Sequence, residues 1–157
     1  MFTAENTVTI DRPVGEVFAY AMDPLRIHEW RPNVLEIIDY EPPLRAGTEY
    51  QIAENMMGRK VFGQRVTEYQ QDRLVVIETT SGSVRPVQRF SVEPLSEGST
   101  RYTARLDITT HGFMRLMEPM FRGSVRKRMV EYGNNLKRNI EALPRVEADA
   151  RPGGTQP

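Results

Sequence analysis

The fold is decided by one stretch of sequence, GFMRLMEPMFRGSVRKRMVEYGNNLKRNIEAL (112–143). Its apolar side chains recur every three or four residues, which predicts one long amphipathic helix. They are Met114, Met117, Phe121, Val125, Met129, Tyr132, Leu136, Ile140 and Leu143. Pro119 interrupts the pattern early, so we expect either a short helical turn with a new start near Pro119 or a kink there.

Short strands separated by turns precede this segment. Apolar and polar residues alternate within each strand, and Gly, Pro, Asp or Ser marks each turn. The expected strands cover 2–10, 34–40, 48–54, 61–69, 74–80, 84–94 and 100–110. Two short helices, one ending near Met22 and one covering 24–28, follow the first strand, and each begins next to a proline. Strands joined by such short turns pair antiparallel.

The sheet and the C-terminal helix must cover each other. Only this helix is long enough to cover the apolar face of the sheet, so we predict an α+β fold. In it, a curved antiparallel sheet of about seven strands wraps around the helix. A helix laid across a strongly bent sheet leaves a pocket between the two. We expect a single domain over 1–143 and, because Pro, Gly and small polar residues follow, a disordered tail over 144–157.

The composition excludes several kinds of chemistry. The chain has 157 residues, no Cys and two His, which argues against thiol catalysis, iron–sulfur clusters and zinc sites. Lys and Arg number 21 and Asp and Glu also 21, so no net charge favours nucleic acid. There is neither a leader-like N-terminus nor an apolar run near the ~18 residues of a membrane span. We expect a cytoplasmic monomer or homodimer with no metal, no cofactor and no integral membrane association.

Strand alternation and the helical stripe select the side chains expected to face the pocket. The methionines of the stripe are either ordinary core or an adaptable surface that fits several ligand shapes. Similarly, Trp30 either seals the core or stacks on a ligand. The expected ligand-binding residues are Trp30, Tyr50, Phe62, Gln64, Gln88, Phe90, Tyr102, Met114, Met117, Phe121 and Met129.

Three titratable side chains are candidates for acid–base catalysis: His28, Glu54 and Glu78. An imidazole such as that of His28 titrates near neutral pH, although a histidine at this place is also compatible with a plain rim position. Glu54 shares a strand face with the apolar Ile52, whereas either face of strand 74–80 can be the buried one. A carboxylate buried among apolar groups has a raised pKa and can act as a base.

A structural role is the simpler interpretation of the strand carboxylate and of the basic run. A salt bridge from the strand carboxylate to Arg59, Lys60 or Arg65 would make it structural. The basic run between Arg122 and Arg128 is typical of a solvated helix face, and less so of a surface for nucleic acid or anionic lipid.

Several short motifs follow one another in a recognisable order over residues 3–142. They are V-x-I-D-R-P-V-x-E-V-F (8–18), D-P-x-R-x-x-x-W (23–30), P-L-R-A-G-T (43–48), R-V-T-E-Y (65–69), D-R-L (72–74), G-S-T-R-Y-T (98–103) and L-K-R-N-I-E (136–141). In these motifs the chain resembles the SRPBCC or START-like superfamily, and most closely its polyketide cyclase/dehydrase and lipid-transport branch. The resemblance implies the helix-grip fold with a ligand cavity under the helix.

Three functions are compatible with such a cavity. The first is binding of a hydrophobic small molecule such as a lipid, a polyketide or an aromatic metabolite, and we favour it because only weak acid–base constellations are visible. The second is a cyclase or dehydratase that works without metal or organic cofactor, largely by confining and orienting a reactive ligand. The third is a partner-binding or stress-response protein whose pocket is vestigial. The sequence leaves open whether the protein is an enzyme.

Overall fold

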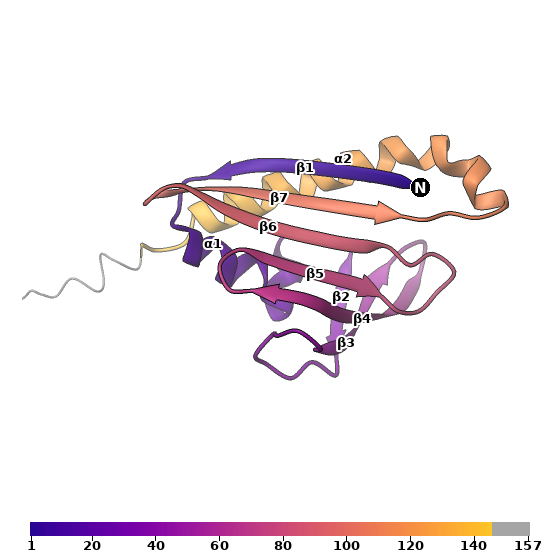
Figure 1. Cartoon of the computed structure of the whole chain (residues 1–157), viewed down its shortest axis with the longest axis horizontal. Coiled ribbons are helices and arrows are strands. Elements are labelled where there is room, and N and C mark those ends of the chain that lie inside the picture. The colour runs from indigo at the N-terminus through magenta and orange to yellow at the C-terminus, as the bar shows by residue number, and fades with distance from the viewer. Residues whose placement is uncertain (146–157) are drawn as a thin grey trace, which may run out of the picture.

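The computed structural model describes residues 1–145 and confirms the predicted α+β architecture (Figure 1). Seven strands form one antiparallel sheet in the order β1-β7-β6-β5-β4-β3-β2. The strands are β1 (Phe2–Ile10), β2 (Val34–Ile38), β3 (Glu49–Asn55), β4 (Arg59–Gln70), β5 (Leu74–Thr79), β6 (Val87–Ser96) and β7 (Ser99–Ile108). The expected tail lies outside the described residues, apart from Pro144 and Arg145.

Three helices complete the fold of residues 1–145. The short helix α1 (Val14–Ala21) and the 3-10 helix η1 (Pro24–Glu29) connect β1 to β2, as the two prolines predict. The long helix α2 (Phe113–Glu141) runs through Pro119 without interruption, so of the two alternatives expected at this proline, a restart or a kink, the restart is wrong. Within residues 1–145, no helix combines the length and the apolar character needed to span a bilayer.

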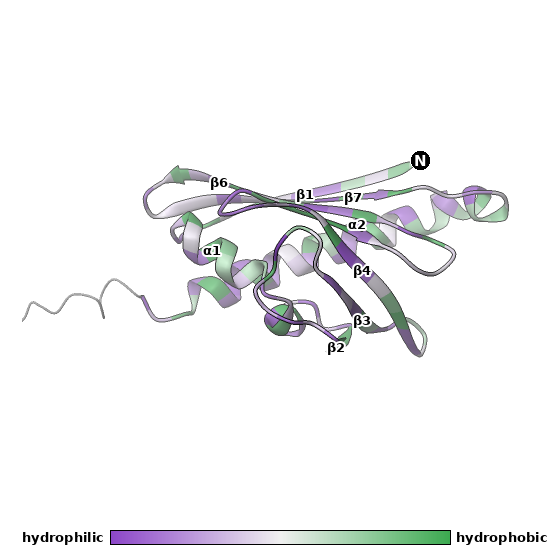
Figure 2. Ribbon diagram, turned by 60° about the horizontal axis from the view of Figure 1, so that its bottom comes forward, coloured by the Kyte–Doolittle hydropathy of each residue, from purple (hydrophilic) through white to green (hydrophobic). Residues whose placement is uncertain are grey.

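The sheet is strongly bent, and its two parts enclose the space next to α2. In Figure 2, β1, β6 and β7 form one layer, while β4, β3 and β2 turn away from it at a steep angle. The bend falls at β4, whose pairing with β5 shifts register between Val66 and Glu68. Such a bulge bends a strand and increases its twist. Gly63 on the same strand approaches the Thr80 side chain so closely that a Cβ there would collide with it.

The C-terminal half of α2 is fixed to the sheet. Leu136 and Ile140 are completely buried in the main core, where they pack with side chains from α1 and the sheet. One turn earlier, Gly133 lets the helix approach β1, because a Cβ would meet Asn6 and Val8. This half of the helix therefore has a single position relative to the sheet.

A buried arginine holds the end of the helix. The Arg12 guanidinium donates hydrogen bonds to the carbonyl oxygens of Ile140 and Glu141, the second at 2.7 Å. Thr100 Oγ1 in turn donates to the Arg12 carbonyl oxygen at 2.8 Å. The last carbonyl groups of a helix have no partner within it and carry partial negative charge, so a buried cation stabilises them.

We predict that Arg12→Ala lowers the free energy of unfolding by about 2–4 kcal/mol, because it removes a charged donor and leaves buried carbonyl oxygens unpaired. Urea denaturation followed by circular dichroism measures the change. Arg101→Ala is the matched control: Arg101 forms an exposed ion pair with Glu93, whose loss costs about 0–1 kcal/mol. Equal effects of the two substitutions would contradict the anchoring role of Arg12.

Candidate functional site

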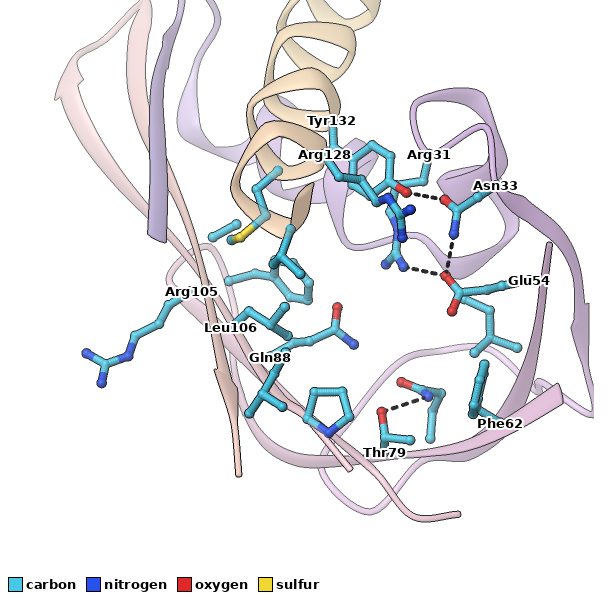
Figure 3. Close-up of a pocket in the computed structure, with 18 of the residues that line it drawn as sticks. Arg31, Asn33, Glu54, Phe62, Thr79, Gln88, Arg105, Leu106, Arg128 and Tyr132 are labelled. Carbon is cyan, nitrogen blue, oxygen red and sulfur yellow. Dashed lines mark hydrogen bonds and ion pairs between the residues drawn. The ribbon is translucent and has the colours of Figure 1, made fainter. Parts of the chain in front are cut away.

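A cavity of about 280 Å³ lies between α2 and the bent sheet (Figure 3). This is close to the lower limit of about 300 Å³ for small-molecule sites. Most of its wall is apolar and comes from β3, β4, β6, β7 and α2. The apolar lining consists of Ile52, Met56, Phe62, Val84, Pro86, Phe90, Ala104, Leu106, Ile108, Val125 and Met129.

A chain of hydrogen bonds crosses one side of the cavity. Arg31 Nη2 donates to Glu54 Oε1 at 2.8 Å, and Asn33 Nδ2 donates to the same oxygen at 3.0 Å. The Tyr132 hydroxyl donates to Asn33 Oδ1. Figure 3 shows these side chains meeting from the η1–β2 loop, β3 and α2. These hydrogen bonds thus connect α2 to the η1–β2 loop and to β3.

The ion pair in this chain is largely withdrawn from solvent. The side chains of Arg31 and Glu54 are only 12% and 13% exposed. The Arg31 guanidinium also lies 5.4 Å from the centre of the Tyr132 ring, a cation–π contact. Glu54 Oε2 makes no hydrogen bond among the described residues, so one oxygen of the carboxylate stays free to interact with a ligand.

A second polar pair lies on the opposite wall. Gln64 Nε2 donates to Thr79 Oγ1 at 3.2 Å and to the Gly63 carbonyl oxygen at 3.1 Å. Gln88 on β6 extends its carboxamide into the space between the Arg31–Glu54 ion pair and the Gln64–Thr79 pair (Figure 3). The cavity therefore offers neutral hydrogen-bonding groups as well as the ion pair.

Three buried donors in residues that line the cavity have no hydrogen-bond partner in the described part of the chain. They are Trp30 Nε1, Arg31 Nε and the Tyr102 hydroxyl. The Trp30 and Tyr102 rings are in edge-to-face contact, with centroids 6.5 Å apart. Burial raises the pKa of Tyr102, which keeps its phenol protonated and able to donate. Buried donors are almost always paired, so three such groups in residues that line one cavity are unusual.

Positive charge predominates at the polar side of the cavity. Arg31 and Arg128 both line it, against the single carboxylate of Glu54. Burial raises the pKa of Tyr132, and the two arginines reduce that shift. Arg105 contributes only its stem, because Figure 3 shows its guanidinium pointing away from the cavity. An electron-rich oxygen of a ligand is therefore favoured on this side.

The structure brings most of the predicted site residues together. Trp30, Glu54, Phe62, Gln64, Gln88, Phe90, Tyr102 and Met129 line the cavity. Tyr50 lines a much smaller neighbouring cavity, which also borders Phe90 and Trp30, and burial raises its pKa to about 12. Period-two alternation thus identified the inner face of four strands.

The other predicted site residues lie elsewhere. His28 and Glu78 are exposed and do not line the cavity, since Ile77 and Thr79 are the residues of β5 that face inward. Met114 is also exposed, and Met117 and Phe121 are half-buried outside the cavity. The reason is that the N-terminal half of α2 packs against the edge of the sheet. There Phe121 contacts Phe2 with ring centroids 6.5 Å apart.

The expected salt bridge also has a different partner. Arg59 pairs with Glu36 and Arg65 with Glu49, both on exposed parts of the sheet, so Glu54 pairs with Arg31 instead. Arg31 and Asn33 follow Trp30 in a loop, where no periodicity shows the direction of a side chain. Sequence reasoning therefore missed these two residues as well as Arg128, Thr79 and the pocket role of Tyr132.

Comparisons with known proteins agree with this architecture. The chain belongs to the polyketide cyclase / dehydrase and lipid transport family, whose sequence model matches residues 1–141. No curated protein matches its sequence.

Solved structures show the same fold at low sequence identity. The ZhuI aromatase/cyclase from Streptomyces sp. R1128 is 14% identical, with a TM-score of 0.74 over 98% of each chain. A START superfamily protein from Mycobacterium smegmatis is 18% identical, with a TM-score of 0.72 over 90% of this chain and 99% of that one. A protein from Thermus thermophilus, TTHA0849, is 19% identical, with a TM-score of 0.65 over 96% of this chain and 100% of that one. At such identities the likeness concerns the fold alone.

We predict that Tyr102→Phe leaves the free energy of unfolding unchanged or raises it by about 1 kcal/mol, because the deleted hydroxyl is buried without a partner among residues 1–145. Tyr132→Phe is the matched control and should cost about 1 kcal/mol, because it removes the bond to Asn33. Urea denaturation of both variants provides the measurement. A loss in Tyr102→Phe as large as that in the control would show that the hydroxyl is structural.

Proposed function

We propose that the protein binds a hydrophobic small molecule that carries at least one oxygen acceptor, such as a lipid, a polyketide or an aromatic metabolite. The observation that carries this proposal is the mainly apolar cavity, whose lining holds three buried donors without a partner in the described residues. Apolar surface removed from water contributes about 25 cal/mol per Å² to binding, and the donors select the oxygen.

The cavity also weighs against a vestigial pocket. In a helix-grip protein that no longer binds a ligand, large side chains would be expected to fill the space between sheet and helix. Here the small side chain of Ala104 and the glycine at 133 lie at the wall, and the cavity retains about 280 Å³. Membership in a family described by both lipid transport and polyketide cyclisation supports a ligand of this kind.

We predict that Ala104→Phe fills the cavity and lowers the affinity for an apolar fluorescent probe, anilinonaphthalene sulfonate, by about tenfold or more. Thr103→Phe is the control, because Thr103 faces the other side of the same strand, where its hydroxyl contacts that of Thr7. Fluorescence titration measures both affinities. Equal affinities of the two variants would show that the probe binds outside the cavity and would contradict the proposal.

Native mass spectrometry of freshly purified protein gives an independent test. A co-purifying hydrophobic molecule that is reduced in Ala104→Phe and retained in Thr103→Phe would identify the ligand. Loss of the molecule from both variants would contradict its location in the cavity.

A cyclase or dehydratase is the second candidate function, and the free Oε2 of Glu54 favours it. In a ring closure, this carboxylate would remove a proton from the carbon next to a ketone of the ligand. The electron pair of that C–H bond would attack a second carbonyl carbon, whose oxygen would take up a proton. Arg31 and Tyr102 supply donors for the developing oxyanion, and the cavity wall supplies orientation.

We predict that Glu54→Gln lowers the rate of ring closure of an acyclic poly-β-keto thioester by about 100-fold or more. Product formation followed by chromatography measures the rate, and probe titration checks that binding persists. His28→Ala and Glu78→Gln are the controls, because both side chains are exposed away from the cavity. Wild-type rates in all three variants would contradict the enzyme hypothesis and leave the binding proposal in place.

A further inference from the structure

We propose that the end of the molecule at which α2 begins docks on the surface of an anionic phospholipid bilayer. The docking surface consists of the exposed apolar side chains of Phe113, Leu116 and Met120 together with the cations of Arg115, Arg126 and Lys127. None of these residues lines the cavity, so the surface is distinct from the ligand site.

The topology places this surface at one end of the sheet. Phe2 at the start of β1 pairs with Ile108 at the end of β7, just before α2 begins. Asn55 and Arg59 pair beside the β3–β4 turn, and Glu78 and Val87 pair beside the β5–β6 loop. Figures 1 and 2 show the start of α2 and both connections at the same end of the molecule. The first turns of α2 extend beyond the sheet there.

The apolar part of the surface is unusually exposed. Phe113, Leu116 and Met120 are 71%, 77% and 74% exposed. Their spacing of three and four residues places them on one stripe of the helix, beside the stripe of Phe121 and Val125 that packs on the sheet. An amphipathic surface helix normally carries polar residues on this side. A contiguous exposed apolar stripe of this kind marks a site of interaction.

The surrounding charge indicates the partner. Residues 113–130 contain five basic residues and one acidic residue, Glu118. Glu118 is buried, where it accepts hydrogen bonds from Thr110 and Arg122. Arg115, Arg126 and Lys127 are exposed and form no ion pair within residues 1–145. The positive charge next to the apolar stripe is therefore not neutralised locally.

A bilayer with anionic headgroups fits both features at once. Apolar side chains enter the boundary between headgroups and acyl chains, while cations on the flank of the helix attract the anionic lipids. A nucleic acid would use the cations and leave the apolar stripe exposed to water. The combination therefore favours a lipid surface.

The cavity lies farther along the same helix than the docking surface. Val125 and Met129, farther along α2, line the cavity, as does the exposed Met56 beside the β3–β4 turn. A docked protein would hold this side of the cavity near the bilayer, and a hydrophobic ligand could exchange between the two. This consequence rests on the proposed ligand binding, whereas docking itself does not.

Co-sedimentation of the full chain with lipid vesicles tests the proposal. We expect binding to vesicles of phosphatidylcholine and phosphatidylglycerol in equal amounts, weaker binding to phosphatidylcholine alone, and release by salt. The double variant Leu116→Ser, Met120→Ser should lower the partition by about tenfold or more, and Arg115→Glu, Lys127→Glu should abolish the preference for phosphatidylglycerol. Leu95→Ser is the control, because Leu95 is also exposed but lies beside the β6–β7 turn, at the opposite end of the sheet.

The outcomes separate docking from ligand binding. Absence of sedimentation of the wild type, or equal sedimentation of the apolar variant and Leu95→Ser, would overturn the docking proposal. So would a change from dimer to monomer in the apolar variant without vesicle binding, which would assign the stripe to a second copy of the chain. Titration with the fluorescent probe in the absence of vesicles should give wild-type affinity in all these variants. Failure of the Ala104→Phe test would therefore contradict ligand binding alone.

Discussion

The structure depends on how the C-terminal end of α2 is attached to the sheet. Arg12 binds the last carbonyl oxygens of the helix, and Leu136 and Ile140 are completely buried below it. Gly133 allows the close approach that this burial requires. These contacts fix the last turns of the helix, whereas Phe121, Val125 and Met129 earlier in α2 pack on a smaller cluster at the other end of the sheet.

The cavity occupies the space between these two regions of contact. It lies under the middle of α2, between the main core and the smaller cluster of Phe2, Ala4 and Ile108. The hydrogen-bond chain from Arg31 to Tyr132 connects the helix to the far wall across the polar side of this space. The first turns of α2 are exposed. The cavity and the proposed docking surface therefore belong to the same helix, one under its middle and one at its start.

Strand alternation predicted the inner wall of the cavity well. Phe62, Gln64, Gln88, Phe90 and Tyr102 lie on it, because side chains on a pleated strand must alternate between the two faces of the sheet. The apolar stripe of the helix predicted the cavity lining less well. A period of 3.6 residues identifies the inward side of a helix, but it does not show how far the sheet extends under it. Met114 and Met117 accordingly carry the correct spacing and still lie outside the cavity.

The polar side of the site depends on loop residues and on contacts between distant segments. Arg31 and Glu54 are 23 positions apart, and Asn33 and Tyr132 are 99 apart, so no local pattern connects them. The sequence by itself determined the seven strands, the long helix and the face of each strand, because these follow from local periodicity and turn residues. Only the tertiary structure decided which part of the helix covers the cavity and which charges meet there, because both depend on the bend of the sheet and the anchoring of α2.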